Sequence, residues 1–350
     1  MAGMSVTPGD AQIGTATRPR RTRRVDPVPF VVVAVALGAL AVLVMLSLML
    51  GAVTLTAPEA LSGLTSNSDA FAHNVVWRIR FPRVLDAMLV GASLGVAGAL
   101  LQGVTRNPLA DPTILGITAA AGLSSSAAIV FIDQQMPQWG IAMAAVAGGL
   151  FGAGVLFVIA WRGAISTVRL ALAGVALSAF FGAAIVGLLS SSRTFLQTSL
   201  GFLAGGLYGS EWSDLHAMLP YVAPALVAAF FLGGRLNMLA LGEDVAASLG
   251  VLTDRTRLGV LAVAGILTAA AVSTAGLVSF VGLVCPHLAR YTVGPDNRYL
   301  LPIAAVYGAI LVVAADLLAK LVIAPSEIPM GIVTAAVGAP FLLYLVKFRP

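Results

Sequence analysis

Residues 78–116 read RIRFPRVLDAMLVGASLGVAGALLQGVTRNPLADPTILG, a run that joins a basic segment, an apolar helix and a proline-broken turn. Pro82 fixes φ and has no backbone donor, so it suits the first turn of a helix. The apolar body of that helix runs from about Val84 to Gly103. Arg80 and Arg83 are three residues apart and therefore share one face. The run predicts an apolar helix with a basic start.

The same run predicts how the helix ends. Asn107-Pro108 cannot continue it, because proline disfavours helical geometry in the residue before it. Asp111-Pro112 offers an N-cap followed by a favoured first helical residue, so a second helix is expected to begin near Thr113. The result is a helical hairpin with a short, stiff, polar corner.

The composition indicates a membrane protein. Of the 350 residues, 59% are hydrophobic and only 10% are charged, which a soluble core with a polar surface cannot accommodate. The single cysteine, Cys285, excludes an intramolecular disulfide. The net charge is positive, but the basic residues lie between apolar segments and form no stripe, so no nucleic acid partner is expected. The sequence predicts an all-α polytopic protein in contact with the lipid bilayer.

Ten apolar runs, of which the eighth is short, are expected to form helices that cross about 30 Å of hydrocarbon. They fall at about 30–52, 84–104, 113–132, 139–161, 168–190, 215–235, 259–279, 281–294, 300–323 and 328–346. Residues 1–29 are predicted to be a disordered basic cytoplasmic tail, and residues 30–350 the ten-helix transmembrane domain. A twin-arginine or secretory signal is disfavoured, because the next run is long enough to span and no small-residue cleavage site follows.

The lysines and arginines predict the orientation. With the N-terminus inside, fifteen of the twenty fall on the cytoplasmic side, as the positive-inside rule requires. The opposite orientation would invert this ratio, so both termini are predicted to be cytoplasmic. The other five residues, on the outer side, are Arg78, Arg80, Arg83, Arg193 and Lys320.

The opening run resembles the signature of the FecCD/BtuC-type permease subunits of ABC importers for iron-siderophores, haem and cobalamin. In that family an R-x-P-R segment begins a helix that ends in Q-x-x-x-x-N-P-L-A-x-P-x-x-L-G. The resemblance covers residues 30–348 and implies a type II ABC importer permease fold in a bacterial inner membrane. The matching residues are Arg80, Pro82, Arg83, Gly91, Gly98, Gln102, Asn107, Pro108, Leu109, Ala110, Pro112, Leu115 and Gly116.

A second run, residues 276–302, is similar to the family's other signature. Asn297 replaces a frequent histidine there. His287 and Cys285 do not share a helical face and no further His or acidic cluster completes a metal shell, so no metal site is expected. The matching residues are Gly276, Phe280, Gly282, Leu283, Pro286, His287, Arg290, Gly294, Asp296, Arg298 and Pro302.

The resemblance implies a docking surface on the outer side for an extracytoplasmic substrate-binding protein. The family's R-x-P-R arginines, here Arg80 and Arg83, pair with acidic residues of that partner, and Lys320 matches a basic residue that helps. The residues alone leave alternatives open. The arginines suit interfacial contact with lipid phosphates, and Lys320 lies four residues after Asp316, so the two can pair within one helix.

A short amphipathic helix is predicted on the cytoplasmic side at residues 239–251. Its acidic first turn would be repelled by an anionic leaflet, so a protein partner is favoured over an interfacial position. The resemblance makes it the coupling helix that inserts into a groove of the ATPase subunit. The residues of this coupling helix are Leu241, Gly242, Glu243, Ala246, Leu249 and Gly250.

The resemblance also implies a cytoplasmic gate. It consists of the corner Asn107-Pro108-Leu109 and the turn around Ser166 and Thr167. The alternative interpretation of both segments is that they are plain hairpin turns.

The chain itself is not expected to be an enzyme. It has no G-x-x-x-x-G-K-[ST] loop, since neither Lys320 nor Lys347 follows a glycine. No cofactor is expected in this chain, and ATP and Mg would bind two partner ATPase subunits. An ion-coupled secondary transporter would need more intramembrane charge than Asp86 and Asp316 supply, and an intramembrane enzyme would need a polar catalytic cluster.

The predicted function is that of a transport subunit driven from outside the chain. It would form a dimer with a second copy or a related permease and import a ferric siderophore by ATP-driven alternating access. Cobalamin and haem are the alternative cargoes.

Overall fold

A computed structural model describes residues 28–65, 70–132, 135–162, 164–165, 167–190 and 202–348. Within these ranges the regular secondary structure is helical apart from one antiparallel hairpin, in which the two-residue strands β1 and β2 pair. The predicted tail lies outside the described residues, except for its last two positions. The elements are α1 (Val28–Met49), α2 (Ala57–Thr65), α3 (Ala70–His73), the π-helix η1 (Asn74–Arg80), α4 (Phe81–Thr105), α5 (Ile117–Phe131), α6 (Gln138–Ala160), β1 (Trp161–Arg162), β2 (Ala164–Ile165), α7 (Thr167–Ser190), α9 (Trp212–Ala240), α10 (Glu243–Ser248), α11 (Thr253–Ala275), α12 (Val281–Val293), α13 (Asn297–Leu321) and α14 (Met330–Phe348).

The ten predicted spans correspond to α1, α4, α5, α6, α7, α9, α11, α12, α13 and α14. Among the described residues, seven helical segments are long and apolar enough to cross a membrane. In the longest of these, α3, η1 and α4 continue into one another from Ala70 to Thr105. Helices α5 and α14 are shorter apolar helices, and α12 has only 13 residues. The predicted all-α polytopic fold is confirmed.

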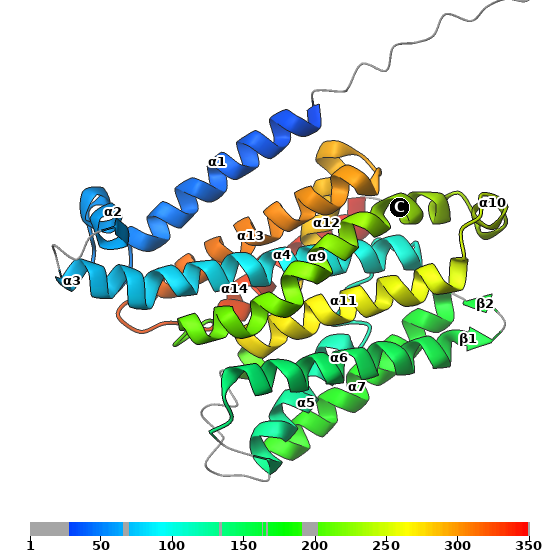
Figure 1. Ribbon diagram of the computed structural model, residues 1–350, viewed down its shortest axis with the longest axis horizontal. Helices are drawn as coiled ribbons and strands as arrows, with labels where there is room; N and C mark the ends of the chain where they lie inside the picture. Colours follow the sequence, from blue (N-terminus) through cyan, green and yellow to red (C-terminus); the bar gives the residue numbers. More distant parts are fainter. Residues whose placement is uncertain are drawn as a thin grey trace, which may run out of the picture.

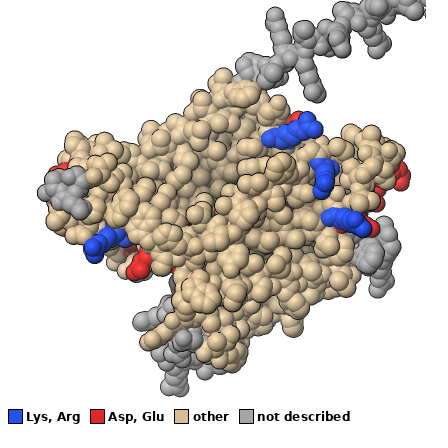
Figure 2. Space-filling view, viewed as in Figure 1, with Lys and Arg blue, Asp and Glu red and all other residues tan. Residues whose placement is uncertain are grey.

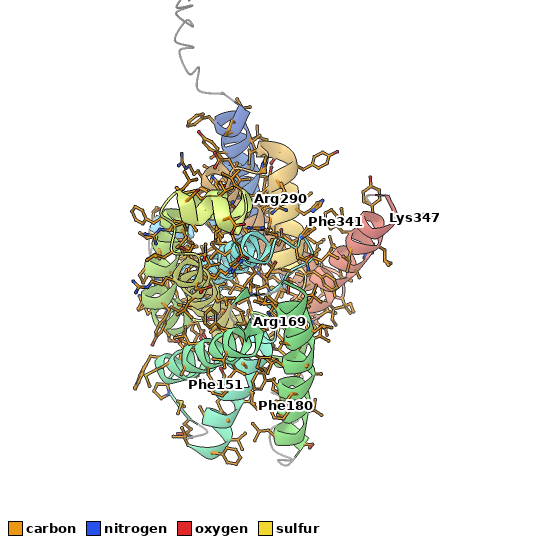
Figure 3. The ribbon with its side chains drawn as sticks, turned by 90° about the vertical axis from the view of Figure 1, so that its right-hand side faces the viewer. Phe151, Arg169, Phe180, Arg290, Phe341 and Lys347 are labelled. Atoms are coloured by element: carbon orange, nitrogen blue, oxygen red, sulfur yellow. The ribbon has the colours of Figure 1, made fainter. Side chains whose placement is uncertain are left out.

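The two ends of the bundle differ in a way that matches the predicted orientation. The beginning of α1, the C-terminal end, α10 and the β1–β2 hairpin lie at one end, and α2 and α3 lie at the other (Figure 1). Figure 2 shows a broad uncharged band between two ends that carry charged side chains. Figure 3 views the end with α10, where Arg169, Arg290 and Lys347 are labelled. We therefore assign this end to the cytoplasm.

Helix α4 is the axis of the bundle, because its small residues bring it into backbone contact with two neighbours. A Cβ atom built on Gly91 would lie 2.2 Å from the carbonyl oxygen of Gly308 in α13. One built on Gly98 would lie 1.8 Å from that of Gly282 in α12. Glycine is needed at both positions, as membrane helices that pack closely require.

In the predicted helical hairpin, the start and end of the first helix are confirmed, but the predicted start of the second helix is wrong. Pro82 lies in the first turn of α4, and Arg106 ends that helix in the left-handed conformation, with φ 51°. The next helix does not begin near Thr113 but at Ile117. Asp111 accepts from the Thr113 backbone N–H at 2.8 Å, yet the chain makes a turn first, and Gly116 has φ 78°. A left-handed residue interrupts the helical path, so α5 starts after it.

Candidate functional site

The outer end of the bundle carries a buried ionic cluster formed by Arg83, Asp316, Lys320 and Glu327. The guanidinium of Arg83 donates to one carboxylate oxygen of Asp316 through Nε at 3.0 Å and Nη2 at 2.9 Å. The other oxygen of Asp316 lies 2.6 Å from the Lys320 ammonium. Asp316 is 1% exposed and balances both cations, so it is the central anion of the cluster.

Glu327, in the loop between α13 and α14, completes this cluster. Its carboxylate lies 2.7 Å from Nη2 of Arg83 and its side chain is 25% exposed. It is thus the most exposed of the four charged groups. The two acids and two bases are balanced in charge.

Arg80 makes a different set of contacts. Its Nη1 donates to the carbonyl oxygens of Leu48 at 2.6 Å and Met49 at 2.9 Å, and its Nη2 donates to that of Val53. These carbonyls lie at and beyond the C-terminal end of α1, where helices leave acceptors unsatisfied. Arg80 is buried and ties α1 to the start of α4.

The structure brings the three residues predicted for docking to one place. Arg80, Arg83, Lys320 and Glu327 line a cavity of about 190 Å³. A second cavity, of about 510 Å³, is lined by Arg83, Asp316 and Glu327 together with residues 206–208 and 328–330. Arg83 and Glu327 therefore lie between two cavities at the outer end.

At the opposite end, α10 forms the predicted cytoplasmic helix. It follows Gly242, which has φ 120°, and is followed by Gly250, which has φ 82°. Only glycine adopts such angles readily, so both turns depend on it. Leu241, Val245 and Leu249 are exposed. We call these three side chains the α10 crest.

Two contacts hold α10 on the bundle. Ala246, on the side away from the crest, is fully buried. The carboxylate of Glu243 forms an ion pair with Nη2 of Arg257 in α11. The predicted helix therefore presents an apolar crest, and in its acidic first turn Glu243 is paired with the bundle while Asp244 is exposed.

The polar corner of the predicted gate lies at this end too. The side-chain oxygen of Asn107 accepts from the Leu109 backbone N–H at 3.0 Å, which folds the corner into an Asx turn. Arg106, the residue before it, donates to the carbonyl oxygen of Leu239 near the end of α9. Leu239 lies four residues before α10, so the corner is bonded to the segment that carries the crest.

The other predicted gate segment is only partly visible. Ser166 lies outside the described residues. Thr167 is the first residue of α7.

Asp111, at the same corner, is completely buried. Burial raises the pKa of its carboxyl, and the N–H and hydroxyl groups of Thr113, which donate to it, act in the opposite direction. This carboxylate fixes the turn that separates α4 from α5. The sequence identified it as a helix cap, but its bonds serve the turn instead.

Residues 39–348 match the family described as the FecCD transport family. The chain belongs to this family. Its members are permease subunits of ABC importers, and in such systems ATP hydrolysis belongs to partner subunits. Together with the apolar helices, this makes the chain a multi-pass protein of the bacterial inner membrane and a subunit of an ABC import system.

Two relatives in the FecCD family illustrate its range. The iron(3+)-hydroxamate import system permease protein FhuG of Bacillus subtilis is 34% identical over 91% of this chain and 96% of its own length. The cobalamin import system permease protein BtuC of Halobacterium salinarum is 38% identical over 79% of this chain and 74% of its own. The similarity extends over most of both proteins.

A solved structure agrees with the fold. It is described as an inward-facing conformation of a metal-chelate type ABC transporter and matches this chain with a TM-score of 0.80. The match has 30% identity and covers 91% of this chain and 99% of the other.

The two FecCD signature runs meet inside the bundle. The side-chain amide of Gln102, at the end of α4, donates to the carbonyl oxygen of Gly282 at 3.2 Å, and its oxygen accepts from Arg290 at 3.2 Å. Gln102 thereby joins α4 to both ends of α12. Among the described residues, no group of three or more His, Cys, Asp and Glu side chains is placed to hold a metal ion.

Proposed function

We propose that this chain imports a ferric siderophore by alternating access, driven by ATPase subunits that bind the α10 crest. Two permease subunits would form the pathway, the second being another copy or a related permease. An extracytoplasmic binding protein would deliver the cargo at the outer end. The observation that carries the proposal is the exposed apolar crest on a cytoplasmic helix.

The exposed apolar side chains of the α10 crest would be more stable in a groove of a protein partner than in water. The side chains of Leu241, Val245 and Leu249 are 64%, 45% and 58% exposed. Val245 lies in α10 and Leu249 follows it by four residues at the C-cap, whereas Leu241 precedes Gly242 and the helix. Recognition of a helix in a groove uses apolar anchors with this spacing. The acidic residues Glu243 and Asp244 in the first turn disfavour an anionic membrane surface as the alternative partner.

The link between the crest and the corner supports a gating role. The bond from Arg106 to the carbonyl of Leu239 connects residues 106–109 with the segment before α10. Movement of α10 with an ATPase subunit would therefore act on Asn107, Pro108 and Leu109. We propose that this corner, with the turn at Ser166 and Thr167, gates the cytoplasmic mouth.

Docking is proposed at the cationic cavity of the outer end. Arg83 and Lys320 carry the charge that an acidic partner would recognise, and Arg80 adds a third cation to the wall. Arg80 already donates to three carbonyls of residues 48–53. We therefore give it a structural role, that of holding these residues against the start of α4. The acidic partner itself would contact Arg83 first.

The proposed cargo, a ferric siderophore, agrees with the hydroxamate relative and with the metal-chelate type structure. The cobalamin permease has a similar identity to this chain, so cobalamin is one alternative cargo. Haem is a further alternative. We propose no cofactor in this chain, with ATP and Mg bound by the partner ATPase.

The test is uptake of radiolabelled ferric hydroxamate, cobalamin and haemin by cells with and without the gene. Loss of iron uptake alone supports the proposal, and loss of cobalamin or haemin uptake instead changes the cargo. The coupling part is tested with Leu249→Asp, which alters the crest and leaves the Glu243–Arg257 pair intact. Uptake that requires the gene but continues after ATP depletion and in Leu249→Asp would refute ATPase coupling.

A further inference from the structure

We infer that Arg83 has an exchangeable carboxylate position, which Glu327 occupies in this structure and which a carboxylate of the docking partner takes in its place. The inference rests on the proposed function for the identity of the partner. The exchange itself concerns only the residues of this chain.

The two anions on Arg83 differ in how firmly they are held. Asp316 receives two bonds from Arg83 and one ion pair from Lys320, and it is 1% exposed. Glu327 has one ion pair, with Nη2 of Arg83, and is 25% exposed. An exposed pair contributes little to stability, whereas a buried one is costly to break. Glu327 is thus the anion that leaves at lower cost.

The position of Glu327 in the chain also favours exchange. Asp316 lies within α13, but Glu327 belongs to the loop that joins α13 to α14, where backbone movement needs no helix to unfold. Its backbone neighbour Ile328 donates to the carbonyl oxygen of Ala319, so the loop folds back over the end of α13. Release of Glu327 would leave Asp316 in place.

The cavities beside Glu327 and the charges that line them indicate which group replaces it. Both outer cavities are lined by Arg83 and Glu327, so a group that enters either cavity reaches the pair. Of the charged residues that line the smaller cavity, three are cations, namely Arg80, Arg83 and Lys320. Without Glu327 this wall is wholly basic and attracts an anion. A carboxylate reproduces the chemistry of the group that leaves.

The consequence for docking is that Glu327 competes with the partner. While Glu327 is bound, Arg83 is neutralised and the outer surface is less attractive to an acidic protein. When the partner's carboxylate binds, the loop after α13 is freed. Docking at the surface is thus linked to movement of the segment that begins α14.

Chemical rescue tests the exchange without any transport. Glu327→Ala in the full chain, in lipid nanodiscs, is expected to lower the unfolding midpoint by about 2–4 °C. Sodium acetate, on the order of 10 mM at half effect, should restore the midpoint, while sodium chloride of equal ionic strength should not. Wild-type protein and the double variant Arg83→Gln/Glu327→Ala should not respond to acetate.

An equal response of all three proteins, or no response of Glu327→Ala, would overturn the inference. A second variant, Glu327→Gln, keeps the size of the side chain and tests replacement in cells. Because it removes the competing carboxylate, it should raise uptake of the labelled cargo above wild type when the cargo is scarce, whereas Arg83→Gln should lose uptake. A loss in Glu327→Gln as large as in Arg83→Gln would show a structural role and refute replacement.

The two proposals fail separately. If acetate rescues Glu327→Ala but neither Arg83→Gln nor Glu327→Gln changes uptake, the exchangeable position stands and the docking function is wrong.

Discussion

The carboxylate of Glu243 in α10 is ion-paired with the guanidinium of Arg257 in α11, so the first turn of α10 is fastened to the next membrane helix. Arg257 is 5% exposed and Glu243 is 42% exposed. The pair fixes the direction in which α10 leaves the bundle, and with it the position of the α10 crest.

The first prediction concerns this pair. Glu243→Arg leaves the buried Arg257 without its anion and should destabilise the protein by about 1–2 kcal/mol, less than a fully buried pair because Glu243 is partly exposed. The double variant Glu243→Arg/Arg257→Glu should recover part of this loss. The loss of stability in the single variant and its recovery in the double variant are both measured as unfolding midpoints in nanodiscs. A double variant no more stable than either single variant would contradict the pairing.

The second prediction separates the crest from the pair. Leu249→Ala removes an exposed side chain, so stability should change by no more than about 0.5 kcal/mol. If Leu249 anchors α10 in a groove, the affinity for the ATPase subunit should fall about tenfold or more. Leu37→Ala in α1 is the matched control, since Leu37 is also exposed. Equal binding of the ATPase subunit by both variants would exclude Leu249 as an anchor.

The third prediction concerns the central anion of the outer cluster. Asp316→Asn leaves Arg83 and Lys320 buried together without a shared charge and should cost about 3–5 kcal/mol. Lys320→Met should cost less, because Asp316 still holds Arg83 through two bonds. Adding Lys320→Met to Asp316→Asn should restore stability, because it removes the repulsion between the two cations.

The unfolding midpoints of Asp316→Asn, Lys320→Met and the double variant test whether Asp316 is the anion shared by Arg83 and Lys320. If Lys320→Met proves as damaging as Asp316→Asn, or the double variant is the least stable, Asp316 is not the shared anion.

Much of the fold followed from local patterns in the sequence. Apolar runs of sufficient length marked the ten helices, and Pro82 marked the first turn of α4. A short cytoplasmic helix was predicted at residues 239–251, but α10 spans only Glu243–Ser248, because α9 extends to Ala240 and Gly242, with φ 120°, interrupts the helical path. The spacing of Asp316 and Lys320 left an ion pair open as one alternative, and the structure shows that pair. Each of these features depends on residues within about one helical turn of one another, or on a single run.

Features that depend on packing between distant segments were not predictable in this way. Arg83 bonds to Asp316 and Glu327, more than 200 positions later in the chain. Glu327 lies in a loop outside the two signature runs, so its contact with Arg83 was not predicted. Arg80 was predicted to face outward, yet its three carbonyl acceptors in residues 48–53 keep it buried. The Asp111–Thr113 turn also displaced a helix start that cap rules alone predicted.

The last prediction tests α4 as the axis of the bundle. In Gly98→Ala the new methyl group would lie 1.8 Å from the carbonyl oxygen and 2.4 Å from the carbonyl carbon of Gly282, which are backbone atoms. No side-chain rotation relieves this overlap, so α4 and α12 must separate, at a cost of at least about 1–3 kcal/mol.

The matched control is Gly154→Ala in α6, where a new Cβ atom meets nothing within 4 Å. It should stabilise the protein by roughly 0.5–1 kcal/mol, because alanine loses less backbone entropy than glycine in a helix. The two variants carry the same chemical change, so a difference in their unfolding midpoints reports the contact alone. Gly98→Ala should also weaken the bond from Gln102 to the Gly282 carbonyl and thus loosen the junction of the two signature runs. Equal midpoints for the two variants would mean that α4 and α12 can separate at little cost.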